Sequence, residues 1–83
     1  MLQVFELRFS DGHDSFFFEG EAVELFEQPH WMIHASVNGE EEDLLHGRHP
    51  LQLTGAFIRR WRRHHPIKLR SQFYGRRRRT AKK

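Results

Sequence analysis

The first twenty residues read as a β-hairpin, and this hairpin restricts the fold more than any other part of the chain. In "LQVFELRF" (2–9) Phe5, Leu7 and Phe9 recur at every second position, which is the period of a half-buried strand. The segment "SDGHD" follows, and an Asp-Gly pair between apolar runs is a strong turn signal. The segment "SFFFEG" (15–20) then predicts the returning strand, with aromatic side chains on both faces. We therefore expect an antiparallel sheet.

Beyond the hairpin the period of the apolar pattern changes several times. It predicts a short helix in "EGEAVELFEQ" (19–28) ended by Pro29, a third strand in "WMIHASV" (31–37), and a longer helix at 53–64. The segment "IKLRSQF" (67–73) alternates again and predicts a last strand. Its charged residues suit an edge of the sheet.

The pair Asn38-Gly39 has two interpretations. As a hairpin turn it would place "EEED" (40–43) in a strand, where acidic residues are depleted. As a helix start, Asn38 would be the cap and Glu41 the third helical residue, as in a capping box. The carboxylates would then lie near the positive end of the helix dipole. We favour the helix, at about 39–46.

The resulting order is β-β-α-β-α-α-β, which predicts an α+β domain at 1–74 with a small antiparallel sheet and short helices on one face. The tail at 75–83 has little to bury, so we expect it to be disordered. In 83 residues without cysteine, eight phenylalanines and two tryptophans must supply the core. No apolar run approaches the roughly 20 residues that span a bilayer, and no signal peptide is recognisable. We expect a soluble cytoplasmic protein.

Charge is divided between the two halves of the chain. All eleven acidic residues lie within 1–43, beside the single basic residue Arg8, whereas 44–83 contain the other thirteen lysines and arginines and no acid. This division indicates a polyanionic partner for the basic half. Its other interpretation, which does not exclude the first, is that the two halves neutralise each other within the fold.

The predicted helix at 53–64 and the tail supply the candidate contacts to nucleic acid, because a guanidinium group forms two hydrogen bonds to a phosphate. Trp61 falls among the apolar residues of the helix, so we expect it in the core rather than stacked on a base. The candidate nucleic-acid-binding residues are Arg59, Arg60, Arg62, Arg63, Lys68, Arg70, Arg76, Arg77, Arg78, Arg79, Lys82 and Lys83, and the candidate stacking residues are Phe73 and Tyr74.

The histidines give weaker signals. The pairs His30/His34 and His46/His49 have usable ligand spacings, but there is no cysteine and no HExxH motif, so we expect neither a metal nor a cofactor. A histidine with neighbouring arginines can support a metal-independent ribonuclease. For such a small basic toxin the candidate residues would be His49, His64 and His65.

Together these features predict a small non-enzymatic accessory protein that binds RNA or DNA with little sequence specificity, since phosphate contacts carry no sequence information. The alternative is an adaptor or inhibitor, of phage or mobile-element origin, that docks on a host protein through the aromatic hairpin 5–18 or through the charged poles. A ribonuclease-type toxin is the third interpretation. Self-association is compatible with each.

Overall fold

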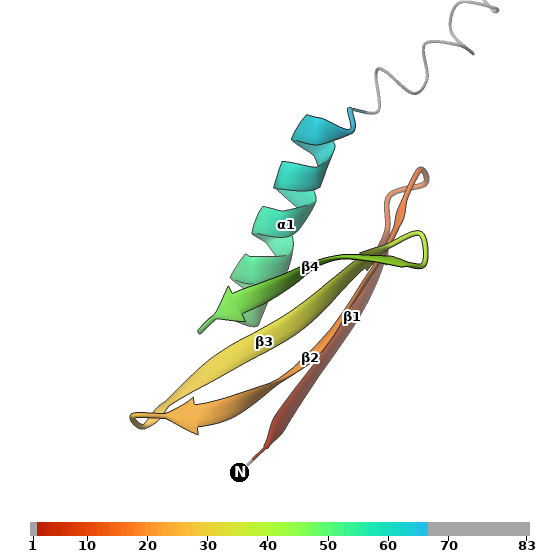
Figure 1. The fold of residues 1–83 in the computed structure, drawn as a ribbon. Coiled ribbons are helices and arrows are strands. Elements are labelled where there is room, and N and C mark those ends of the chain that lie inside the picture. The colour runs from red at the N-terminus through yellow and green to blue at the C-terminus, as the bar shows by residue number, and fades with distance from the viewer. Residues whose placement is uncertain (1, 67–83) are drawn as a thin grey trace, which may run out of the picture.

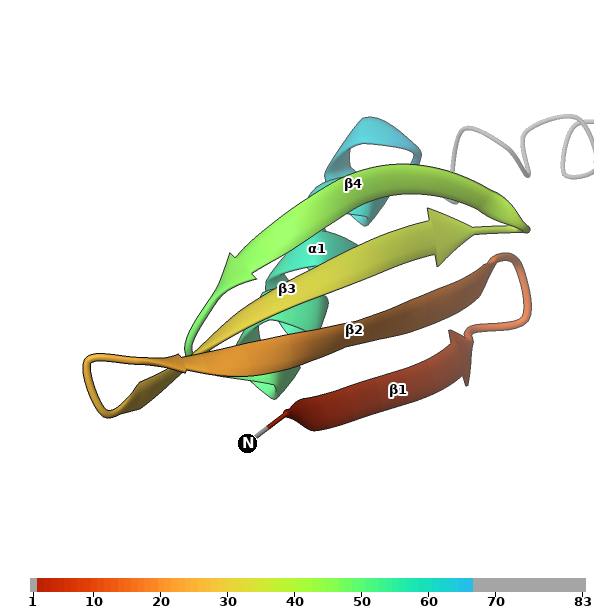
Figure 2. The same ribbon diagram turned by 60° about the horizontal axis from the view of Figure 1, so that its bottom comes forward.

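The computed structural model of the chain describes residues 2–66, apart from the side chain of Leu25 (Figure 1). These residues form an antiparallel meander followed by one helix. The strands β1 (Gln3–Ser10), β2 (Ser15–Leu25), β3 (Gln28–Val37) and β4 (Glu40–Gly47) lie side by side in chain order, and α1 (Pro50–His64) crosses one face of the sheet (Figure 2). The predicted α+β class, with an antiparallel sheet covered on one face, is confirmed.

The core lies between this covered face and α1. Phe16, Phe18 and Ile33 are its largest fully buried side chains, and each reaches the covered face because alternate residues of a strand point to the same side. Phe57 of α1 meets Phe18 edge to face, with ring centroids 5.8 Å apart. Burying one such ring contributes about 1.5–3 kcal/mol. The alternation predicted at 2–9, 15–20 and 31–37 is confirmed.

The helix predicted at 19–28 is wrong, because this segment completes β2. Residues 21–25 pair with β3 along their whole length, and Ala22 is buried opposite Trp31. The apolar spacing that suggested a helix arises because Phe26 is not part of the core: its side chain is 90% exposed at the tip of the hairpin.

A two-residue turn at Phe26-Glu27 joins β2 to β3. Both residues have positive φ, 54° and 64°, as in the hairpin turns that match the twist of the flanking strands. Such turns normally contain Gly or Asn, and this one contains neither. Pro29 therefore lies within β3, opposite Glu24, and ends no helix.

The helix predicted at 39–46 is also wrong, and the hairpin interpretation of Asn38-Gly39 is correct. The two residues have φ of 53° and 88°. The Asn38 side chain accepts a hydrogen bond from the Ser15 N–H at 2.9 Å instead of capping a helix. In β4 a bulge leaves Glu42 between two paired neighbours. The bulge interrupts the strand period, and all four acidic residues stay exposed, so their charges cost little.

The helix predicted at 53–64 is confirmed as α1, which begins one turn earlier. Pro50 occupies the first helical turn, where its missing N–H costs nothing. Thr54 and Phe57 are buried against the sheet. Within residues 2–66 no helix is long and apolar enough to cross a membrane. The predicted last strand at 67–73, the domain end at 74 and the tail at 75–83 lie outside the described residues.

Candidate functional site

Two arginines of α1 point away from the sheet. At 100° per residue, Arg59 and Arg63 share a side of the helix with Gln52, opposite the buried Thr54 and Phe57. Both guanidinium groups belong to exposed residues, and neither has a carboxylate partner in the part of the chain that the structure describes. We call Gln52, Arg59 and Arg63, with the small residues Gly55 and Ala56, the outward stripe.

The other two arginines of the helix point to its flanks, where each meets a carboxylate of the acidic half. The Arg60 Nη2 atom lies 3.1 Å from Asp43 Oδ2 on β4, and the Arg62 Nη2 atom lies 3.1 Å from Asp11 Oδ2 in the β1–β2 turn. The four candidate contacts are therefore divided into two arginines that hold a carboxylate and two that face solvent.

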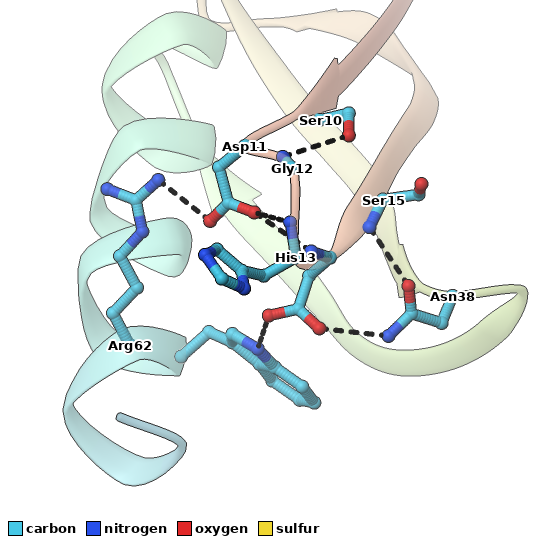
Figure 3. Close-up of polar contacts among 9 residues, drawn as sticks. Ser10, Asp11, Gly12, His13, Ser15, Asn38 and Arg62 are labelled. Carbon is cyan, nitrogen blue, oxygen red and sulfur yellow. Dashed lines mark hydrogen bonds and ion pairs between the residues drawn. The ribbon is translucent and has the colours of Figure 1, made fainter. Parts of the chain in front are cut away.

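Asp11 is a strong partner for Arg62 because the turn orients it (Figure 3). Its Oδ1 atom accepts the backbone N–H of His13 at 2.9 Å and that of Asp14 at 2.8 Å, while Oδ2 faces the guanidinium group. The two backbone hydrogen bonds, with a smaller contribution from Arg62, lower the pKa of Asp11 to about 2. The carboxylate therefore stays charged and keeps Arg62 engaged.

Asp14 joins the same turn to the core. It is 4% exposed and accepts hydrogen bonds from Trp61 Nε1 at 3.3 Å and Asn38 Nδ2 at 3.1 Å. The Trp61 ring is half-buried and packs against the core, as predicted. Its ring also stacks on His65 with centroids 3.7 Å apart, so a base has no open ring face there to occupy.

An open hollow lies beside the outward stripe at the start of α1. Its volume is about 720 Å³. Gly55 gives it a low floor, over which the Arg59 side chain lies: a Cβ atom at Gly55 would be 3.6 Å from Arg59 Nη1. Arg48 and His49 close its other end. A polyanion backbone can approach such a surface closely, because no large side chain projects from its centre.

The uncovered face of the sheet carries acidic residues instead. Glu6 and Glu19 lie directly opposite each other on β1 and β2, with Glu21 on the same face one pleat further along. His34 Nδ1 lies 3.0 Å from Glu41 Oε2 on this face. The outward stripe and these carboxylates therefore lie on opposite sides of the two layers.

The histidines do not gather at one place. His49 precedes α1, whereas His64 and His65 lie at its other end, about 22 Å away by the helical rise. The His30 ring lies near His46, with centroids 5.9 Å apart, rather than beside His34. Within residues 2–66 no three histidine or carboxylate side chains are placed to hold a metal ion.

Comparison with known proteins adds no relative. No family model, no curated protein and no solved structure matches this chain significantly. The argument about function therefore depends on the geometry alone.

Sequence reasoning missed the part of this surface that is not arginine-rich. Arg48, Gln52, Gly55 and Ala56 were not among the candidates, although a helical wheel places the last three beside Arg59. The remaining candidates lie outside the described residues: Lys68, Arg70, Phe73, Tyr74, Arg76, Arg77, Arg78, Arg79, Lys82 and Lys83.

Proposed function

We propose that this protein is a small non-enzymatic nucleic-acid-binding protein that contacts the phosphate backbone through the outward stripe of α1. The observation that supports it best is the pair Arg59 and Arg63, which lie one helical turn apart, exposed and without a carboxylate partner within residues 2–66. Nothing acidic lies on α1 to repel a phosphate. The basic residues of the strand expected at 67–73 and of the tail at 75–83 extend this surface.

Binding of this kind discriminates little between sequences, because the hollow beside Arg59 offers cations and small residues but no built edge for reading a base. The carboxylates on the uncovered face of the sheet orient the molecule, since a polyanion repels that face and attracts the opposite one.

The test compares two double variants that remove the same charge. R59Q/R63Q deletes the two outward arginines, whereas R60Q/R62Q deletes the two that hold carboxylates. Fluorescence anisotropy of a labelled single-stranded RNA and a labelled duplex DNA is measured as salt rises from about 50 mM. We expect R59Q/R63Q to lower the slope of log K against log salt by about 1.5–2, as for two lost phosphate contacts, and R60Q/R62Q to lower it by less than half as much.

Circular dichroism checks that both variants are folded before binding is compared. Equal losses in the two variants would show that only net charge matters, and would contradict a defined contact surface. No binding of either probe by the full chain at about 50 mM salt would overturn the proposal altogether.

A second candidate function, docking on another protein, is supported by the β2–β3 turn. Phe26 is 90% exposed there and is held at positive φ, and strained residues cluster at functional sites. For this function F26S should abolish capture of one stoichiometric partner from a nuclease-treated lysate, with nucleic-acid binding unchanged. Capture by F26S equal to that by the natural chain would remove this candidate.

A further inference from the structure

The two edges of the described sheet differ in how they are protected. β4 has a bulge at Glu42 and four exposed acidic residues, which are devices that oppose pairing with another strand. β1 pairs with β2 in unbroken register from Gln3 to Ser10, and it contains neither a proline nor a bulge. Within residues 2–66 nothing pairs with the other edge of β1.

The covered face is also incomplete beside β1. The backbone of α1 lies closest to β3 and β4, so Phe5 and Leu7 are only half-buried and Phe9 is 41% exposed. On the flank of α1 that faces β1, the side of Arg62, Ile58 is half-buried and Leu51 is 68% exposed. We call these five apolar residues the β1 strip.

We propose that residues 67–73 of the same chain add a fifth strand to the free edge of β1, antiparallel to it. Ile67, Leu69 and Phe73 occupy alternate positions in this segment. Residues that face each other in an antiparallel pair share a face, so these three extend the β1 strip and cover it.

The same register gives the charges a partner. Lys68 and Arg70 then lie on the uncovered face, beside β1. There Glu6 and Glu19 oppose each other directly, an arrangement that destabilises a sheet unless a cation is near. A shift of one residue would bury the cations and expose the apolar residues, so the alternation selects this orientation.

The position of the last described residues favours the same edge. Arg62 contacts Asp11 at 3.1 Å, immediately after the end of β1, so the chain leaves α1 at the end of the sheet toward which β1 runs. A strand that starts there and returns along β1 is antiparallel to it. Seventeen residues follow Pro66, and extended they reach about 55 Å, enough for a connection and a strand as long as β1.

A tethered segment also has an advantage over other occupants. Its effective concentration at β1 is of the order of millimolar, which a second copy or a foreign strand does not match at ordinary concentrations. The other two occupants are distinguished by the test.

The test attaches a nitroxide spin label at Q72C in the full chain, which has no other cysteine, and measures the loss of amide NMR signals. We expect the amides of β1 to broaden at least several-fold more than those of β4. A matched label at K83C, beyond the proposed strand, should broaden β1 less. Broadening of β4 in preference to β1, or no selective broadening, would overturn the proposal.

Two further measurements separate the occupants and the cause. Mixing spin-labelled protein with ¹⁵N-labelled, label-free protein reports contact between copies, and broadening of β1 in that sample would replace the tethered segment by a second copy. L69D places a carboxylate in the β1 strip, so we expect the broadening from Q72C to disappear and β1 amides to exchange with solvent at least ten-fold faster, with β3 unchanged. Unchanged broadening in L69D would contradict the apolar contact.

Discussion

At the scale of single residues, Asp11 connects the first hairpin turn to α1. Two backbone N–H groups and Arg62 converge on its carboxylate. The Asp-Gly turn could be predicted from the sequence, but this ion pair could not, because its partner lies 51 residues away. For the same reason the sequence did not separate Arg62 and Arg60 from Arg59 and Arg63: helical spacing gives their directions, whereas their partners depend on the sheet beneath.

The lowered pKa of Asp11 predicts how stability changes with pH. The pKa is about 2 in the folded chain against 3.8 ordinarily, so the charged carboxylate stabilises the fold above about pH 4, and this contribution is lost as pH falls toward 2. In D11N we expect the free energy of unfolding, measured in urea, to fall less between about pH 5 and pH 2 than in the natural chain.

A matched variant, E42Q, removes one exposed carboxylate of the β4 bulge and should keep the pH dependence of the natural chain. If D11N and E42Q showed the same dependence as the natural chain, the turn would not be the source of the lowered pKa.

At the scale of elements, the hairpin turns decide which strands the sequence reveals. Asp-Gly and Asn-Gly both mark turns, and alternation revealed β1, β3 and the first half of β2. The second half of β2 was missed because Phe26-Glu27 adopts a turn conformation without the residues that normally signal it. β4 was missed because its bulge breaks the strand period and its acidic residues resemble the first turn of a helix.

The β2–β3 turn predicts a stabilising change. Replacing Phe26-Glu27 by Asn-Gly should raise the free energy of unfolding by about 1–2 kcal/mol, because the left-handed conformation costs other residues about 1 kcal/mol or more each. Urea denaturation measures the change.

The opposite change at the β3–β4 turn is its control. G39A should lower stability by about 1 kcal/mol through the backbone alone, since φ is 88° and no atom lies within 4 Å of the added Cβ. A destabilised Asn-Gly variant at positions 26 and 27 would contradict the turn geometry.

Gly20, in the middle of β2, predicts a much larger effect. An added Cβ would collide with the main-chain carbonyl oxygen of Met32 on β3, and a backbone atom cannot move aside as a flexible side chain can. We expect G20A to lower the free energy of unfolding by about 3 kcal/mol or more, seen as a large fall in the urea midpoint. A change below about 1 kcal/mol would show that β2 and β3 are less closely paired at this point than described.

At the scale of the whole molecule, the division of charge along the chain becomes a division between two faces. The hairpin meander places Glu6, Glu19 and Glu21 on the uncovered face of the sheet, and α1 carries Arg59 and Arg63 on the opposite side. Only the ion pairs of Arg60 and Arg62 cross between the halves. Both interpretations of the charge pattern therefore apply, each to one pair of arginines, and the unpaired side is the one assigned to a polyanion.

The most direct test of this assignment is an amide NMR titration of the full chain with a short single-stranded RNA at low salt. The account predicts that the largest shift changes within residues 2–66 occur at Arg48, Gln52, Gly55, Arg59 and Arg63, and that the amides of Glu6, Glu19 and Glu21 do not move. Shift changes centred on the uncovered face of the sheet, or none on α1 while the RNA is bound, would contradict it.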